Sequence, residues 1–306
     1  MKKYANVAIW AVFALLSSSV ISEAEDNGGL IILPTSDVVP PTVSEGPLFT
    51  FEAEGWGGYN LVAGATGTAL ENGTLDSLPA FGGDARLALI LPSGLYLQGD
   101  FIAEKTTADD TNGNNWRSAR TLGGHAGYRD SQNLFGAFGA LGDSYSEVDN
   151  VANFWAYGIE FRHSWDNLSA LAQFGYFDAT DDGGGVPSFI HNGIFARGHL
   201  KYVITDASAL SGELSYASAQ QGTIGATIFG WGARYDQSFD SSPISGFLAY
   251  DGISYNNGIG AYVDNVIKIG LQVHFNSGGN TSFGRNADTL DLPNFGRWVG
   301  AGNSID

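Results

Sequence analysis

The stretch at residues 266–275 constrains the fold more than any other part of the chain, because its side chains alternate with a period of two. One face carries Ile267, Ile269, Leu271, Val273 and Phe275, and the other carries Lys268, Gly270, Gln272 and His274. Successive side chains of a β-strand point to opposite faces of its sheet. A strand with one apolar and one polar face suits a closed sheet that has lipid outside and water inside.

Twelve segments can be read as strands, each with about the ten residues that a tilted strand needs to cross the hydrocarbon layer of a membrane. None of the nine prolines lies inside these segments, as expected for a residue that cannot donate to a strand ladder. The sequence therefore predicts an all-β fold, a transmembrane antiparallel up-and-down β-barrel. The predicted strands are 48–59, 82–91, 94–105, 116–128, 133–145, 152–164, 168–178, 192–204, 207–217, 224–236, 244–255 and 264–275.

Short and long connections alternate between these strands. Outer-membrane barrels have short periplasmic turns and longer extracellular loops, so an even number of strands places both termini in the periplasm of a bacterial outer membrane. A soluble sandwich or propeller would also alternate, but its apolar faces would point inward. The predicted loops are 60–81, 106–115, 146–151, 179–191, 218–223 and 256–263.

The N-terminus resembles a secretory signal peptide. Lys2 and Lys3 precede an apolar stretch at residues 5–21, which a small-x-small site at Ser22–Ala24 follows. A membrane-anchoring helix is the alternative interpretation. The predicted organisation is a signal peptide at 1–24, a flexible Pro-, Ser- and Asp-rich segment at 25–46, the barrel at 48–275 and a C-terminal extension at 276–306.

Composition excludes several classes of function. Cysteine is absent, so the chain has neither disulfides nor a lipid-modified N-terminal cysteine. A net charge of −18 argues against a nucleic-acid partner. The five histidines lack the spacing of a metal site, and no G-x-S-x-G motif occurs. We therefore expect no cofactor, no metal site and no catalytic residues, with a membrane-embedded hydrolase as a minor alternative.

The polar face of each predicted strand should line the lumen of the barrel. Inward bases and acids tend to fall on neighbouring strands, where opposite charges help to fix pairing and register. Such a wall suits a polar channel, but it also suits an ion-pair network that fills a narrow barrel. Barrels of eight strands are filled by side chains and barrels of sixteen hold an aqueous channel, so twelve strands are compatible with either interpretation. His125, His199 and His274 are expected on the same face. The predicted lumen-lining charged residues are Glu52, Glu54, Arg86, Asp100, Glu104, Arg117, Asp143, Glu160, Arg162, Arg197, Lys201, Glu213, Arg234, Asp251 and Lys268.

Aromatic residues fall near both ends of the predicted strands, where their rings would lie at the membrane interfaces. The set expected on the periplasmic side is Phe49, Phe51, Phe161, Trp165, Tyr202, Tyr235 and Phe275. The set expected on the outer side is Trp56, Tyr59, Trp116, Trp155, Tyr176, Tyr216 and Tyr255.

The leader, the alternating strands and a last strand that ends in Phe275 resemble the porin-like outer-membrane β-barrel proteins of Gram-negative bacteria. The resemblance covers residues 48–275 and is architectural. It implies that Phe275, which closes the last strand, acts as the signal for the barrel assembly machinery. This chain departs from the usual pattern of the group, because 31 residues follow Phe275. It also implies outer-membrane lipid and lipopolysaccharide as surroundings.

The expected function is passive diffusion of small polar solutes through a porin-like channel. A non-conducting structural or adhesion barrel that works through acidic extracellular loops, such as Asp109 and Asp110, is the alternative. The extension contains an apolar stretch at residues 290–299. It could fold back as a plug at the periplasmic mouth, dock on a periplasmic partner, or remain disordered.

Overall fold

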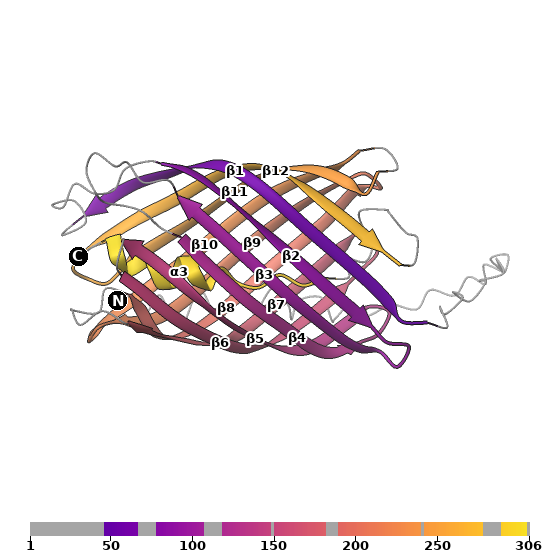
Figure 1. The fold of residues 1–306 in the computed structure, drawn as a ribbon, viewed down its shortest axis with the longest axis horizontal. Helices are drawn as coiled ribbons and strands as arrows, with labels where there is room; N and C mark the ends of the chain where they lie inside the picture. The colour runs from indigo at the N-terminus through magenta and orange to yellow at the C-terminus, as the bar shows by residue number, and fades with distance from the viewer. Residues whose placement is uncertain are drawn as a thin grey trace, which may run out of the picture. The chain divides into compact units, whose positions relative to one another are not determined.

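Twelve strands close into one antiparallel barrel in the computed structural model, which describes residues 46–66, 78–106, 118–147, 150–181, 189–239, 242–277 and 289–304 (Figure 1). Each strand pairs with the next along the chain, and β1 pairs with β12 to close the sheet. The predicted fold is therefore confirmed. The elements are β1 (Leu48–Thr66), β2 (Pro79–Ile90), β3 (Leu95–Thr106), β4 (Ser118–Arg129), β5 (Asn133–Glu147), β6 (Asn150–Ser164), β7 (Leu168–Asp181), β8 (Ile190–Thr205), β9 (Ser208–Gln221), β10 (Ile224–Ser238), β11 (Ile244–Asn256), β12 (Ala261–Asn276), the helix α3 (Phe295–Gly300) and the 3-10 helix η1 (Ala301–Ser304).

The predicted signal peptide and nearly all of the predicted N-terminal segment lie outside the described residues. No helix in the described part of the chain has the length and hydropathy of a membrane span.

The two ends of the barrel differ in their connections. Thr50 pairs with Asn276, so β1 begins where β12 ends. We call this the turn end, because the strands there are joined by the short connections 91–94, 130–132, 165–167, 206–207 and 239–243. The opposite end, which we call the loop end, holds the longer connections 67–78, 107–117 and 182–189.

Two of the predicted loops are tight connections instead. Gln221 pairs with Ile224, and Glu147 pairs with Asn150, so only two residues join each of these strand pairs. The strands continue beyond the boundaries predicted at 218–223 and 146–151, because backbone pairing persists past the last alternating residue. The alternation of short and long connections is therefore incomplete.

At the turn end, the carboxylate of Asp130 closes the connection between β4 and β5. It accepts hydrogen bonds from the backbone N–H groups of Gln132 (2.8 Å) and Asn133 (2.7 Å). These bonds favour the charged form and hold the pKa of Asp130 below its usual value.

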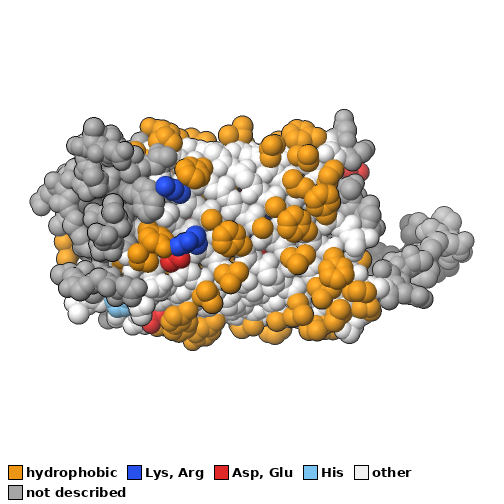
Figure 2. All heavy atoms as spheres, in the orientation of Figure 1, with side chains coloured by type: hydrophobic (Ala, Val, Ile, Leu, Met, Phe, Trp, Pro, Cys, Tyr) orange, Lys and Arg blue, Asp and Glu red, His pale blue; other side chains and the backbone are white. Residues whose placement is uncertain are grey.

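The outward face of the barrel is apolar, as a lipid-facing wall requires. Ile267, Ile269 and Leu271 on β12 all point outward and are exposed. Figure 2 shows hydrophobic side chains spread over the visible outer face, with few charged ones among them. A soluble sandwich or propeller would bury this face, so the transmembrane type of barrel explains the pattern.

Exposed aromatic side chains ring both ends of the wall. All seven residues predicted for the periplasmic girdle have exposed side chains near the turn end. Two of them, Phe51 and Phe275, stack with their ring centroids 6.4 Å apart. Trp56 and Tyr255 were wrongly assigned to the outer girdle. Lys268 Nζ lies 4.5 Å from the centre of the Trp56 ring, and the Tyr255 hydroxyl donates to Gln221 (2.5 Å), so both rings lie inside the barrel.

Strand parity explains this correction, because Trp56 is two residues from the inward Glu54. Trp116 lies outside the described residues.

If the outer wall faces lipid, the stability lost on placing a charged side chain there should depend on its depth in the membrane. Ile269 lies near the middle of the outer wall and Leu95 begins β3 at the turn end. We expect Ile269→Arg to lower the free energy of unfolding by about 2–4 kcal/mol and Leu95→Arg by about 0–1 kcal/mol. Denaturant unfolding from phospholipid vesicles measures both, and equal costs would contradict a membrane-spanning wall.

Candidate functional site

The interior of the barrel is occupied by the C-terminal part of the chain. We call residues 289–304 the lumen segment; it comprises an extended stretch followed by α3 and η1. Figure 1 shows α3 enclosed by the strands, toward the loop end. Leu290 packs with Tyr96 near the turn end, whereas the carbonyl of Ala301 accepts from the Tyr262 hydroxyl (2.6 Å) near the loop end. The segment therefore runs lengthwise through the barrel.

This path differs from the predicted plug at the turn-end mouth. The described chain ends at the loop end, opposite the end of β12. The apolar residues of the segment explain the difference, because Leu290, Leu292, Phe295, Trp298 and Val299 are all buried inside the barrel. Docking on an external partner would require these side chains to leave the lumen.

Side chains of the wall satisfy the backbone of the extended stretch. Gln98 makes two bonds to Leu290, accepting from its N–H (2.8 Å) and donating to its carbonyl (2.7 Å). Gln173 and Arg197 each donate to the carbonyl of Asp291 (2.9 Å). Buried backbone groups need partners, and here the amide and guanidinium side chains take the place of a neighbouring strand.

Charged and polar pairs attach the segment at three further points. Asp291 Oδ1 lies 2.7 Å from Arg86 Nη1. Asn294 Nδ2 donates to Glu104 (2.9 Å). Near the loop end, Arg297 Nη2 lies 3.3 Å from the Asp264 carboxylate and donates to the backbone carbonyl of the same residue (3.0 Å).

An apolar cluster surrounds α3. Asn294 caps the helix by accepting from the Arg297 N–H (3.1 Å). Phe295 and Trp298 then project into a group of rings from the wall, with centroid separations of 5.3 and 5.5 Å to Phe195. Phe138, Phe154 and Phe177 complete the group. These rings replace the water that would otherwise fill the loop-end half of the lumen on the β4–β8 side.

Close approach between segment and wall depends on glycine at two positions. A Cβ atom on Gly123 would overlap the side chain of Leu292, and a Cβ on Gly296 would overlap Ala119. The fit is therefore specific to small residues on both partners.

Most of the residues predicted to line the lumen lie on the inward face. Several form ion pairs within the wall: Arg197 with Glu213, Arg234 with Glu54, and Lys268 with Asp251, each at 2.6 Å. The inward set is Glu52, Glu54, Arg86, Asp100, Glu104, Glu160, Arg162, Arg197, Lys201, Glu213, Arg234, Asp251 and Lys268.

Asp143 was wrongly predicted to face the lumen. Its carboxylate accepts from Arg120 Nε (3.0 Å) on the outer wall, while Ser144 points inward and donates to the carbonyl of Gly296 (3.0 Å). Small and apolar residues occur at both parities of β5, so alternation alone does not orient this strand. Arg117 lies outside the described residues.

Among the described residues, sequence reasoning missed several charged side chains of the lumen. Asp84, Asp236 and Asp264 share the parity of Arg86, Arg234 and Lys268 on their own strands, so strict alternation would have found them. Asp291 and Arg297 belong to the lumen segment. No periodic signal marks them, because this segment is not part of the sheet.

Two of the histidines predicted to face inward take part in the same internal network. His125 lies between Glu160 (2.8 Å) and Asp100 (3.1 Å) in the buried centre of the barrel, and His274 lies 2.9 Å from Glu52. Within the part of the chain that the structure describes, no group of three or more His, Asp or Glu side chains has the arrangement of a metal site.

A small charged cavity remains beside the lumen segment. It has a volume of about 170 Å³ and lies against the β1–β3 and β8–β12 side of the wall. Its lining includes Glu54, Arg86, Glu104, Arg234 and Lys268. Binding pockets for small molecules usually hold about 300–1,000 Å³, so this space suits a few water molecules or ions.

Comparisons with known proteins give structural likeness only. No family model and no curated protein sequence matches the chain. A crystal structure of the COG4313 outer membrane channel from Pseudomonas putida F1 is 14% identical, covering 78% of this chain and 100% of that one, with a TM-score of 0.49. The KdgM porin in complex with disordered oligogalacturonate is 11% identical, covering 73% and 99%, with a TM-score of 0.40. The beta domain of the Bordetella autotransporter BrkA is 13% identical, covering 76% and 100%, with a TM-score of 0.43.

The Asp291–Arg86 pair predicts how firmly the lumen segment is held. We expect Asp291→Asn to loosen the segment, because it removes a charge-assisted bond worth about 1.5 kcal/mol. The chain has no cysteine, so Ala301→Cys provides a single buried label site. The labelling rate with a water-soluble maleimide should rise about tenfold in the Asp291→Asn background.

Asp236→Asn is the matched control for this experiment. It removes a carboxylate that pairs with Arg234 at 2.8 Å within the wall. Equal labelling rates in the two backgrounds would show that Asp291 does not hold the segment.

Proposed function

We propose that the protein is an outer-membrane channel for small polar solutes that its own lumen segment closes in this conformation. The observation that carries the proposal is a charged inner wall occupied by a segment that is not a strand of that wall. In the described part of the chain, side-chain hydrogen bonds, ion pairs and apolar packing hold the segment in place. A solute path opens when it moves.

The membrane location rests on the outer surface. The apolar wall and the aromatic rings at its two ends match a barrel that spans lipid. All five connections at the turn end are short, whereas the three longest connections, 67–78, 107–117 and 182–189, lie at the loop end. By the general pattern of outer-membrane barrels, the turn end lies in the periplasm and the loop end lies outside.

The wall remains largely neutralised without the segment. Arg234, Lys268 and Arg197 are each paired with a wall carboxylate at 2.6 Å. Removing one member of a buried ion pair is costly, but displacement of the segment leaves these pairs intact and exposes them to water. An unoccupied barrel is therefore a feasible state.

The charge pattern favours polar solutes without strong selection by sign. Inward acids and bases are interleaved, and β2, β6, β10 and β12 each carry both signs, so the field along the wall changes sign over short distances. Inward polar groups would replace the hydration partners of a passing solute, and the bore would set the size limit.

Conductance in planar bilayers tests the proposal. We expect a variant without residues 278–306 to give stable conductance steps, because nothing then occupies the lumen beside the wall. The full-length chain should conduct less and intermittently. Equal, negligible conductance of both folded proteins would contradict a channel.

A reversible lock provides the same test in a full-length chain. A Cβ on Gly300 would lie 2.7 Å from Ser144 Oγ, which approaches the roughly 3 Å between a sulfur and the far Cβ of a disulfide. Ser144→Cys with Gly300→Cys should therefore cross-link the segment to β5. Oxidation should abolish the open events and reduction should restore them, whereas each single variant should be indifferent to redox conditions.

A non-conducting structural barrel is the second candidate. The ring cluster around Phe295 and Trp298 favours it, because such packing gives a rigid interior. The acidic loops of the adhesion alternative lie largely outside the described residues, and neither they nor a hydrolase activity is tested by the geometry. The role of Phe275 as an assembly signal also stays a proposal; its ring is exposed at the end of β12.

A further inference from the structure

Charged residues on the outer wall gather at the loop end. Among outward positions whose side chains the structure describes, Lys105, Arg120, Asp143 and Asp178 carry charge, and each lies near the loop end of its strand. Figure 2 shows basic side chains among hydrophobic ones toward that end. An arginine on a lipid-facing wall is costly at mid-depth and nearly free at the interface, so this cluster marks the headgroup level.

The two bases are neighbours on one face of the sheet. Arg120 on β4 pairs with Ala103 on β3, and Lys105 lies two residues farther along β3. Such diagonal neighbours are within reach of long side chains. A single anionic group can therefore contact both.

The guanidinium of Arg120 is held in position while remaining accessible. Its Nε donates to Asp143 (3.0 Å), its Nη2 donates to the Tyr145 hydroxyl, and its carbon lies 5.3 Å from the centre of the Tyr145 ring. The side chain is nevertheless 56% exposed. Asp143 is its acidic partner, and Lys105 is a second basic side chain on the same face of the sheet.

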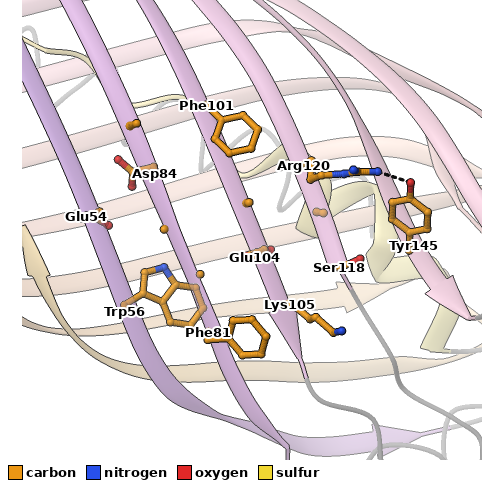
Figure 3. Close-up of a pocket in the computed structure, with 15 residues that line it drawn as sticks. Glu54, Trp56, Phe81, Asp84, Phe101, Glu104, Lys105, Ser118, Arg120 and Tyr145 are labelled. Carbon is orange, nitrogen blue, oxygen red and sulfur yellow. Dashed lines mark hydrogen bonds between the residues drawn. The ribbon is translucent and has the colours of Figure 1, made fainter.

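An apolar groove begins beside these bases. Figure 3 shows the side chains that line it, with Phe81 and Phe101 on the same side of the sheet as Lys105 and Arg120. Its volume is about 710 Å³, and its lining includes the small residues Gly83 and Ala103 on neighbouring strands. Glu54, Asp84 and Glu104 also line it, but their side chains point toward the interior of the barrel. On the outward side, the groove presents apolar residues at one end and Arg120 and Lys105 at the other.

We propose that this groove binds a phosphorylated glycolipid of the outer leaflet, of the lipid A type. A phosphate contacts Arg120 and Lys105, and an acyl chain lies between Phe81 and Phe101 over the small residues. Arginine binds phosphate through its planar, multiple donors. The choice of an outer-leaflet lipid rests on the orientation given under the proposed function, in which the loop end faces outward.

Lipid retention measured by native mass spectrometry tests this site. The purified barrel in detergent is incubated with bisphosphorylated lipid A, with monophosphorylated lipid A, or with phosphatidylglycerol. We expect Lys105→Gln with Arg120→Gln to retain about tenfold less bisphosphorylated lipid A than the original chain. Arg120→Lys should restore part of the binding lost in Arg120→Gln.

Thr227→Glu is the matched control for Arg120→Gln. Thr227 faces outward near the loop end of β10, so the variant changes the net charge by the same amount at a similar depth on another part of the wall. Retention should fall in Arg120→Gln and stay unchanged in Thr227→Glu. Equal effects of the two variants, or equal retention of lipid A and phosphatidylglycerol, would overturn a specific site.

Two further outcomes separate this proposal from its alternatives. A dimer that disappears in the double variant would identify a second copy of the chain as the occupant and overturn the lipid proposal. Insertion into vesicles and conductance are measured on the same proteins. A barrel that inserts and conducts but retains no lipid A overturns the site alone, whereas failure to insert overturns the membrane location itself.

Discussion

The closure of the sheet by β1 and β12 is the constraint on which the other features depend. In lipid, every backbone donor and acceptor must find a partner within the protein, and only a sheet without edges meets this demand for strands. Once the sheet is closed, each residue has one of two environments. The period of two then assigns apolar side chains to lipid and polar side chains to the interior, as on β12.

Closure also creates a space that the wall does not fill. Barrels of eight strands are filled by their own side chains, and much larger ones hold water. Here the lumen segment takes up the intermediate space, with rings at the loop end and backbone bonds to Gln98 and Arg197 farther along. The inner face of the wall and the lumen segment therefore form an interface in which the two are complementary in charge and shape.

Alternation predicted the fold and most of the inward charges, because parity is a local property of a strand. It failed where the local pattern is weak. Small residues occur on both faces of β5, so alternation did not orient this strand and Asp143 was assigned to the wrong face. Trp56 was assigned to the outer girdle because aromatic residues favour membrane interfaces, although its position in the alternation of β1 points it inward. The apolar stretch at 290–299 suggested a plug as one of three possibilities, but its path and partners inside the barrel were not predicted. Leu290 and Gln98 are 192 residues apart, and nothing periodic connects them.

The partners of the lumen segment are distributed around the whole circumference of the sheet. Thr289 bonds to Glu52 on β1, Leu290 to Gln98 on β3, Asp291 to Arg197 on β8, and Ala301 to Tyr262 on β12. These groups come together only after the first and last strands have met. The lumen segment can therefore make all of these contacts only with the closed sheet. By linkage, its binding stabilises the pairing of β1 with β12 relative to any state in which these strands are apart.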